Sequence, residues 1–371
     1  MKIAWTTDQH VGNYGKNGGP VVAGLNQRCR DVLRSFAWAR ARMVELGCST
    51  HVGLGDLFDY DRVEPQVIAA MQDLLDSDTI VDHFLVGNHD QRSLASLDHA
   101  LAPLRGVAKT IADTEPRWVT AGPAAILLVP FRSGRAEDWL PEVVAAASKG
   151  LPQWDGPHVL AFHLGVSDSR TPYYLDDADD QVCLGTVERV LREHRFDYAF
   201  AGNWHVHRRW TVEGAGGREC EVVQVGTLAP NRFTDTGGRF GTMAVLDTDT
   251  RAVEIIDVPG PRFVKVAGIV ALRELVSGDR DPLAIPLYVS VSVPPEDVAE
   301  AEDLLTRVEA RATEIQLDDS RQKAQAAAAV QVAVSAQSHH EAVVDYIRSA
   351  PIDAPRAAVE RFVLDCLQEA K

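Results

Sequence analysis

The stretch YAFAGNWHVH, residues 198–207, joins an apolar run to two histidines that are one residue apart. The run Tyr198–Ala201 predicts a short buried strand. Side chains two apart in an extended chain point the same way, so His205 and His207 are expected on one face. A lone histidine at a strand end is commonly a surface or core residue. Two on one face indicate a metal site only if other ligands meet them, so the rest of the chain decides what this stretch means.

The same arrangement recurs through the first 260 residues. Short apolar runs alternate with stretches of helical periodicity, such as residues 27–46, for which Gly47 fits a C-terminal cap. Buried strands that alternate with helices are typical of an α/β layered domain. The runs are KIAWT (2–6), THVGLG (50–55), DHFLVG (82–87), AAILLVP (124–130), HVLAFH (158–163), DYAFAG (197–202) and EVVQVG (221–226), and a β-hairpin is expected over 241–258.

Side chains of the types that bind metal ions, namely Asp, Asn and His, follow five of these runs. Functional groups in an open α/β sheet gather at the carboxyl ends of the strands, so we expect these side chains to converge in one cleft. Each motif alone is weak, but the ordered set, with every member at a strand end, is specific. The residues are Asp8 and His10, then Asp56, then Asn88, His89 and Asp90, then His163, and finally His205 and His207.

The chemistry of the expected ligands is consistent across the set. Carboxylate, amide and imidazole donors without sulfur suit Mn²⁺, Fe²⁺ or Zn²⁺ in an open catalytic geometry. The set is too large for one ion and suits two ions roughly 3.5–4 Å apart, as in phosphoester hydrolysis. Asp56 is the candidate bridging carboxylate. His89 is the candidate that stabilises or protonates the leaving oxygen, with Asp90 to orient it.

The composition bounds the functions that the chain can have. Its 371 residues suffice for two or three domains. A net charge of −16 argues against nucleic-acid binding by bulk attraction, although bound metal ions can reverse the local field. No apolar run approaches the roughly 20 residues of a membrane span, and MKIAWTTDQH is no signal peptide, so we expect a cytoplasmic protein. The five cysteines show no CxxC spacing, which favours reduced thiols.

The composition shifts after Pro259-Gly260-Pro261. We predict an α/β domain over residues 1–260 and an α/β capping domain over 261–320, in which 286–317 read as strand, helix and strand. An Ala/Gln-rich linker follows over 321–337, where the sequence also allows helix. We expect two short amphipathic helices over residues 338–371. Such a pair either packs on its own domain or docks on a partner, and the pattern leaves both open.

The motifs TDQH, GDLFD, GNHD, FHLG and NWHVH, which span residues 8–207, resemble the calcineurin-like metallophosphoesterase superfamily. The architecture beyond residue 260 is similar to its SbcD/Mre11 nuclease branch, phage-encoded relatives included. The resemblance implies an α/β fold, namely a four-layer α/β/β/α metallophosphoesterase sandwich with a small α+β cap and a C-terminal helical segment. One ion would be held by Asp8, His10, Asp56 and His207. The other would be held by Asp56, Asn88, His163 and His205, with His89 as a catalytic histidine that is not a ligand.

The same resemblance implies a function. The chain would be a Mn²⁺-dependent DNA exonuclease and endonuclease, the nuclease subunit of an SbcCD/Mre11-Rad50-like complex in DNA repair or recombination. The C-terminal helices would dock an SMC-like ATPase of the SbcC/Rad50 type, and the chain would form a homodimer without membrane association. One alternative is a small-substrate metallophosphatase or cyclic-nucleotide phosphodiesterase, which the acidic charge favours and the C-terminal elements disfavour. Another is a non-catalytic scaffold, which the complete ligand set disfavours.

Some residues depart from the family pattern or have two readings. The superfamily usually has glycine directly before the first histidine of its last motif, whereas Asn203 and Trp204 intervene here. Trp204 either stacks on substrate or packs in the protein. Asp59 is expected to cap the turn after GDLF rather than touch the site. The loop 12–19 either admits a DNA backbone or is a surface loop, and Arg132 and Arg232 are candidate DNA contacts.

Overall fold

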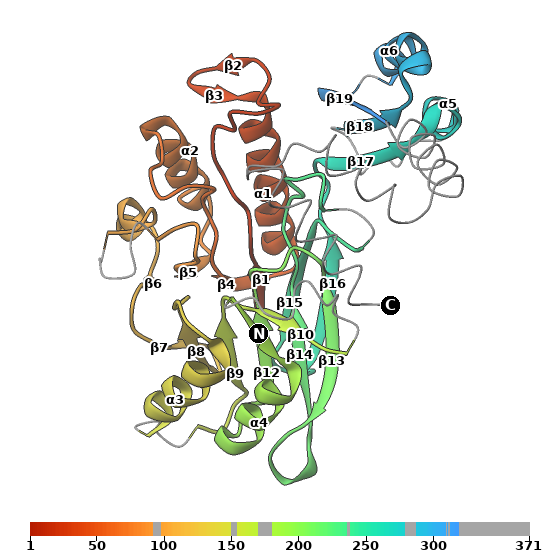
Figure 1. Ribbon diagram of the computed structural model, residues 1–371. Coiled ribbons are helices and arrows are strands. Elements are labelled where there is room, and N and C mark those ends of the chain that lie inside the picture. The colour runs from red at the N-terminus through yellow and green to blue at the C-terminus, as the bar shows by residue number, and fades with distance from the viewer. Residues whose placement is uncertain are drawn as a thin grey trace, which may run out of the picture.

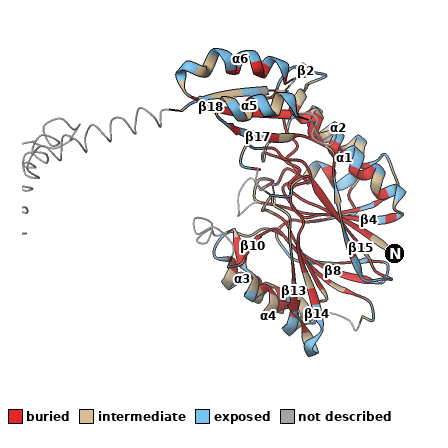
Figure 2. Cartoon of the chain, turned by 90° about the vertical axis from the view of Figure 1, so that its right-hand side faces the viewer, coloured by how far each residue is buried: buried red, intermediate tan, exposed pale blue. Residues whose placement is uncertain are grey.

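The computed structural model describes residues 1–91, 98–149, 154–169, 180–235, 238–278, 287–308, 310 and 312–318. Figure 1 shows two large sheets with helices on their outer sides and a smaller unit beside the end of α1. Figure 2 shows that the strands are buried along most of their length, whereas the helices expose their outer faces. This burial pattern is the one expected when each sheet lies between its partner sheet and a helical layer.

The first sheet is parallel at its centre and covered by two helices. Strands β1, β4, β5 and β6 run parallel, and β15 and β16 extend the sheet as the expected antiparallel hairpin. The strand order is β16 (Ala252–Asp257), β15 (Thr242–Asp247), β1 (Lys2–Thr6), β4 (Cys48–Gly53), β5 (Val81–Leu85) and β6 (Thr110–Ala112). Helices α1 (Gln27–Glu45) and α2 (Pro65–Leu75) pack on its outer face through one apolar core.

The second sheet has the same design. Strands β8, β9, β12 and β14 run parallel, and β7 and β13 are antiparallel edge strands. The order is β13 (Arg208–Glu213), β14 (Glu219–Gln224), β12 (Tyr198–Ala201), β9 (His158–Phe162), β8 (Ala124–Val129) and β7 (Arg117–Ala121). Helices α3 (Ala136–Ser148) and α4 (Leu184–His194) cover its outer face.

A third core joins the two sheets. The rings of Trp5 on β1 and Phe200 on β12 stack with centroids 4.0 Å apart, and both side chains are buried. Full burial of large apolar side chains contributes about 1.5–3 kcal/mol each, so this layer fixes the sheets face to face. The predicted four-layer α/β/β/α sandwich is therefore confirmed.

Helix α1 shows why the local sequence folds as expected. The side chain of Asn26 accepts a hydrogen bond from the Cys29 N–H at 2.9 Å, which satisfies a free donor of the first turn. Phe36 and Met43, at helical spacing, are fully buried against the first sheet. Gly47 has φ +72° and donates to the Val44 carbonyl at 3.0 Å, so it ends the helix as predicted.

The smaller unit follows residue 260 and has its own core. Its parallel sheet consists of β17 (Arg262–Ala267), β18 (Leu287–Val293) and β19 (Ala312–Leu317), with α5 (Gly268–Ser277) and α6 (Val298–Arg307). The strand, helix and strand predicted over 286–317 are present, and β17 with α5 precedes them. The predicted linker 321–337 and helices 338–371 lie outside the described residues.

Short elements complete the described chain. They are β2 (Val21–Val22), β3 (Leu25–Asn26), β10 (Gly165–Ser167), β11 (Gln181–Cys183) and 3₁₀ turns at Ala102–Gly106, Ala215–Gly217 and Pro295–Asp297. Among the residues that the structure describes, no helix combines the length and apolarity needed to cross a bilayer.

Candidate metal centre

Every predicted ligand follows the carboxyl end of a parallel strand. From the first sheet, Asp8 and His10 follow β1, Asp56 follows β4 and Asn88 follows β5. From the second sheet, His163 follows β9, and His205 and His207 follow β12. Three of these residues have left-handed backbones, with φ of 51° at Asp8, 48° at His10 and 51° at Asp56. Strained backbone of this kind persists where the surrounding fold enforces it, commonly at functional sites.

One donor group consists of Asp8, His10 and His205. The Nε2 atoms of His10 and His205 are 3.1 Å apart, and Asp8 Oδ1 is 3.9 Å from His10 Nε2. Asp8 is fully buried, and within the described part of the chain its Oδ1 has no hydrogen-bond partner. A buried carboxylate oxygen without a donor, beside two converging imidazole nitrogens, is the environment that a cation satisfies.

A second donor group lies around Asp56 and His163. His163 Nε2 is 3.3 Å from Asp56 Oδ1 and 2.9 Å from Asn88 Oδ1. The other carboxylate oxygen of Asp56, Oδ2, is 3.8 Å from His10 Nε2. Asp56 thus faces both donor groups, which fits the bridging role expected for it.

The histidines are held by their Nδ1 atoms. His163 donates from Nδ1 to the Leu54 carbonyl at 2.6 Å, and His207 donates to the Gln224 carbonyl at 2.9 Å. His205 Nδ1 lies 2.9 Å from Asp235 Oδ1. An acceptor at Nδ1 places the proton there and leaves the Nε2 lone pair for a metal ion. The residues present therefore fit two divalent cations.

The electrostatics of the cluster agree with this fit. Burial opposes ionisation of Asp56, but the neighbouring His163 and His10 hold the pKa of its carboxyl far below the usual range. Burial likewise opposes charging of His163, yet the Asp56 carboxylate raises its pKa to about 9. Both shifts show that the Asp56 carboxylate favours a positive charge beside it. In the protein without metal this charge is a proton on His163, and a bound divalent cation would supply it instead.

His89 lies at the edge of this cluster. Its backbone N–H donates to Asp56 Oδ1 at 2.9 Å, and its ring packs edge-on against His10 with centroids 4.7 Å apart. Its Nδ1 is 3.1 Å from the Asp59 carbonyl oxygen. His89 is half-buried and lines a pocket beside the donor groups, so its ring can reach a bound substrate.

The contacts of Asp90 differ from the expected ones. Its carboxylate accepts hydrogen bonds from the N–H groups of Gly87 at 2.9 Å and Phe58 at 3.0 Å. Among the described contacts it has no hydrogen bond to His89, because it is turned inward to join the loops after β4 and β5. The carbonyl of Asp59, not the carboxylate of Asp90, orients the His89 ring.

The division of ligands between the two ions also differs from the one that the resemblance implies. His205, rather than His207, lies against Asp8 and His10. Asp235 fixes the Nδ1 side of the His205 ring and so turns Nε2 toward His10. Within the described residues His207 belongs to none of the close donor groups.

Four described residues outside the predicted ligand set lie near the site, and all of them except Asp235 were singled out from the sequence. Asp59 does contact the site, since its Oδ1 is 3.3 Å from His10 Nδ1, so the expectation that it would not touch the site is wrong. Asn203 donates its backbone N–H to Asp8 Oδ2 at 3.0 Å. The indole of Trp204 packs directly on Gly165, where a Cβ atom would lie 2.2 Å from the ring. Asp235 lies eleven residues after the end of β14, and no local sequence pattern indicated its contact with His205.

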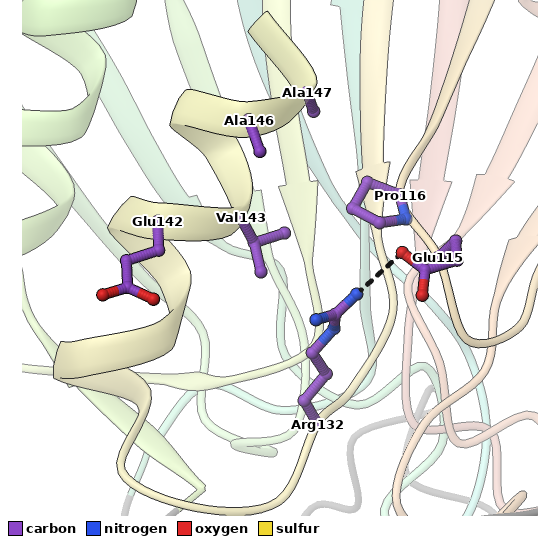
Figure 3. Close-up of a pocket in the computed structure, with 7 residues that line it drawn as sticks. All are labelled: Glu115, Pro116, Arg132, Glu142, Val143, Ala146 and Ala147. Atoms are coloured by element: carbon purple, nitrogen blue, oxygen red, sulfur yellow. Dashed lines mark hydrogen bonds and ion pairs between the residues drawn. The ribbon is translucent and has the colours of Figure 1, made fainter.

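The candidate DNA contacts differ from each other. Arg132 donates to the Glu115 carboxylate and the Thr114 carbonyl, both at 3.1 Å. Figure 3 shows this pair in a pocket of about 370 Å³ that Glu142 also lines, which makes it unfavourable for a phosphate. Arg232 is exposed and lines the pocket beside His89.

The loop 12–19 is packed in part against its surroundings. The Tyr14 hydroxyl donates to the His10 carbonyl, and Lys16 pairs with Glu314 on β19 at 2.9 Å. The Gly18 carbonyl accepts the Arg28 N–H at 3.0 Å. These contacts tie the loop to α1 and to the smaller unit, while Gly15, Lys16 and Gly19 are exposed.

Comparisons with known proteins add limited information. No protein-family model matches the chain, and no curated protein matches it. A dimetal phosphatase from Danio rerio aligns with 66% of this chain and 92% of its own, at 14% identity and a TM-score of 0.40. A putative 5'-nucleotidase from Staphylococcus aureus, in complex with alpha-ketoglutarate, aligns with 70% of this chain at 15% identity and a TM-score of 0.38. The chain spans 53% of that structure. Similarity at this level carries no argument about reaction or substrate.

Proposed function

We propose that this chain is a dinuclear metal-dependent phosphoesterase that hydrolyses phosphodiester bonds in DNA. The observation that carries the hydrolase assignment is Asp56, whose Oδ2 lies 3.8 Å from His10 Nε2 and whose Oδ1 lies 3.3 Å from His163 Nε2. His89 lies beside both groups without being needed as a ligand. Two divalent ions bound there, for which we propose Mn²⁺, would activate a water molecule and polarise the phosphoryl oxygen.

The protein groups have separate tasks in this reaction. Asp59 and Asp235 orient His10 and His205, so their Nε2 atoms are already directed at the metal site. His89 points Nε2 away from the Asp59 carbonyl and supplies a proton or a hydrogen bond to the leaving oxygen. Nearly complete burial of Asp8, Asp56 and His163 excludes water from the ligands and strengthens each of these interactions.

The choice of DNA rests on the unit formed by β17–β19, because the architecture beyond residue 260 resembles the SbcD/Mre11 branch. The ordered motifs resemble the wider superfamily. We further propose that the segment 338–371 docks an SMC-like ATPase and that the chain acts as a homodimer in DNA repair or recombination. The second candidate is a small-substrate phosphoesterase. Two observations favour it, namely the net charge of −16 and the pairing of Arg132 with Glu115 rather than with solvent.

The test uses the purified full chain with Mn²⁺, end-labelled duplex DNA and bis-(p-nitrophenyl) phosphate. We expect the wild type to cleave both substrates and His89→Ala to lose about 10²–10⁴-fold in rate. His158→Ala, at the opposite end of β9 from His163, is the control and should retain activity. Cleavage of only the small ester would favour the second candidate. If neither substrate is cleaved, with or without an SbcC-type ATPase, the hydrolase proposal is wrong.

A further inference from the structure

A pocket of about 340 Å³ adjoins the metal centre through His89 and Asp59. Its other lining residues are Tyr14, Arg28, Tyr60, Asn231 and Arg232, and we call it the Asn231 pocket. The size falls at the lower end of the range for small-molecule sites, roughly 300–1,000 Å³. A substrate whose phosphate lies at the metal centre would extend its adjoining group into this pocket.

Asn231 is the unusual member of the lining. It is only 1% exposed, and among the described residues neither its Nδ2 nor its Oδ1 has a hydrogen-bond partner. Its backbone is held, because its N–H donates to Asp235 Oδ2 at 2.9 Å. A buried polar group left unpaired destabilises the fold, so such groups are rare without a functional reason. The carboxamide offers one donor and one acceptor, side by side, to a ligand.

The remaining lining is flat and cationic. The Arg28 guanidinium lies 3.9 Å above the Tyr14 ring and 5.2 Å from the Phe263 ring of β17. Aromatic rings and guanidinium planes are the surfaces on which nucleobases stack. Tyr60 is 49% exposed, and Arg232 is exposed as well, so the pocket also offers an accessible ring and a positive charge.

We propose that the Asn231 pocket binds the nucleobase of the nucleotide whose phosphate lies at the metal centre. The carboxamide of Asn231 would pair with a base edge that places a donor beside an acceptor. The Watson–Crick edge of every base has this pattern, and so does the N6/N7 edge of adenine, which asparagine binds in DNA. Arg28 and Tyr60 would contact the base plane. This inference rests on the proposed phosphoesterase function and narrows its substrate to nucleotides, free or at the end of a nucleic acid.

Binding is measured first, by calorimetry on the full chain in Mn²⁺. The ligands are dAMP, dCMP, dGMP and dTMP, each compared with 2-deoxyribose 5-phosphate, which carries the same phosphate and sugar but no base. We expect at least one nucleotide to bind about tenfold or more tightly than the sugar phosphate. Asn231→Ala should abolish that advantage, and Asn231→Asp, which keeps the shape but loses the donor, should reduce it. Arg132→Ala, in the pocket of Figure 3, should keep it.

The proposal is overturned if the wild type binds all four nucleotides no better than the sugar phosphate, or if both Asn231 variants keep the advantage. Circular dichroism is used to check that both variants are folded. If Asn231→Ala does not fold, the comparison is made with Asn231→Asp alone. Hydrolysis of bis-(p-nitrophenyl) phosphate is measured separately. If the wild type hydrolyses this ester but binds nucleotides no better than the sugar phosphate, only the pocket proposal is wrong. If it binds nucleotides better than the sugar phosphate but does not hydrolyse the ester, only the phosphoesterase proposal is wrong.

Discussion

Replacing Asp235 by asparagine should weaken metal binding through the tautomer of His205. Asp235 Oδ2 accepts the N–H groups of Asn231 at 2.9 Å and Arg232 at 3.1 Å, while Oδ1 faces His205 Nδ1 at 2.9 Å. In Asp235→Asn the amide oxygen must keep the two backbone donors, so the NH₂ group faces Nδ1. Nδ1 then has to accept a hydrogen bond, and the proton moves to Nε2, the atom that should bind the ion.

The size of the effect follows from the two ways in which the asparagine can be placed. The opposite orientation keeps the tautomer but points the NH₂ group at two buried N–H donors, at a cost of about 1–3 kcal/mol for each donor left unpaired. The tautomer change is the less costly outcome. Loss of the group that orients a ligand histidine typically lowers metal affinity 10- to 100-fold, about 1.4–2.7 kcal/mol. We expect a loss in this range at the weaker of the two sites.

The assay is a Mn²⁺ titration of the full chain, followed by the electron paramagnetic resonance signal of the free ion. It compares the wild type, Asp235→Asn, His205→Ala and the double variant, with the exposed Asp257→Asn as control. Because Asp235 acts through His205, the double variant should bind no more weakly than His205→Ala. Wild-type affinity in Asp235→Asn, or losses that add in the double variant, would refute the reasoning.

Three further results are expected. Burial lowers the pKa of His83 to about 4. Between about pH 6.5 and pH 4 this histidine is therefore protonated in the unfolded chain but neutral in the folded one, so the free energy of unfolding decreases as the pH falls through this range. His83→Leu should remove up to about 3 kcal/mol of that fall in urea unfolding with chelator, and an unchanged fall would contradict it. Gly87→Ala places a Cβ 2.2 Å from Asp56 Oδ1 and should lower the Mn²⁺ affinity at least about tenfold. Gly106→Ala is the control, since a Cβ at Gly106 would have no heavy atom within 4 Å, and it should keep the wild-type affinity. In a Cys366→Ser background, a thiol reagent should label exposed Cys183 quickly and buried Cys29 slowly, since burial raises the Cys29 pKa to about 12, and equal rates would disprove this.

The positions of the ligands could be predicted because they depend on strand ends alone. Parallel strands bring their carboxyl ends to one edge, and an apolar run followed by Asp or His is visible in the sequence. The roles of His205 and His207 could not be assigned in this way. The chain after β12 is not extended, since Asn203 has φ +78°, so the alternation that places residues two apart on one face does not apply.

Residues that orient the ligands were harder to predict because each depends on a loop conformation. Asp59 reaches His10 from the GDLFD turn, in which Asp56 has a left-handed backbone that the sequence does not indicate. Asp235 lies well beyond the end of β14, in a loop without strong periodicity. The sequence contains both carboxylates, but only the tertiary structure pairs them with histidines.

The loop after β14 explains how a unit without metal ligands can affect the metal centre. Thr227 at its start donates to the Asp8 carbonyl at 2.6 Å, and Asp235 at its end holds His205. Between them, Phe233 packs edge-on against Phe263 of β17, with ring centroids 5.1 Å apart. A displacement of β17 would therefore move the loop that carries Asn231 and orients His205. The same loop therefore contacts the candidate metal ligands, the Asn231 pocket and the smaller unit, so a change in the position of that unit would be transmitted to the metal centre through this loop.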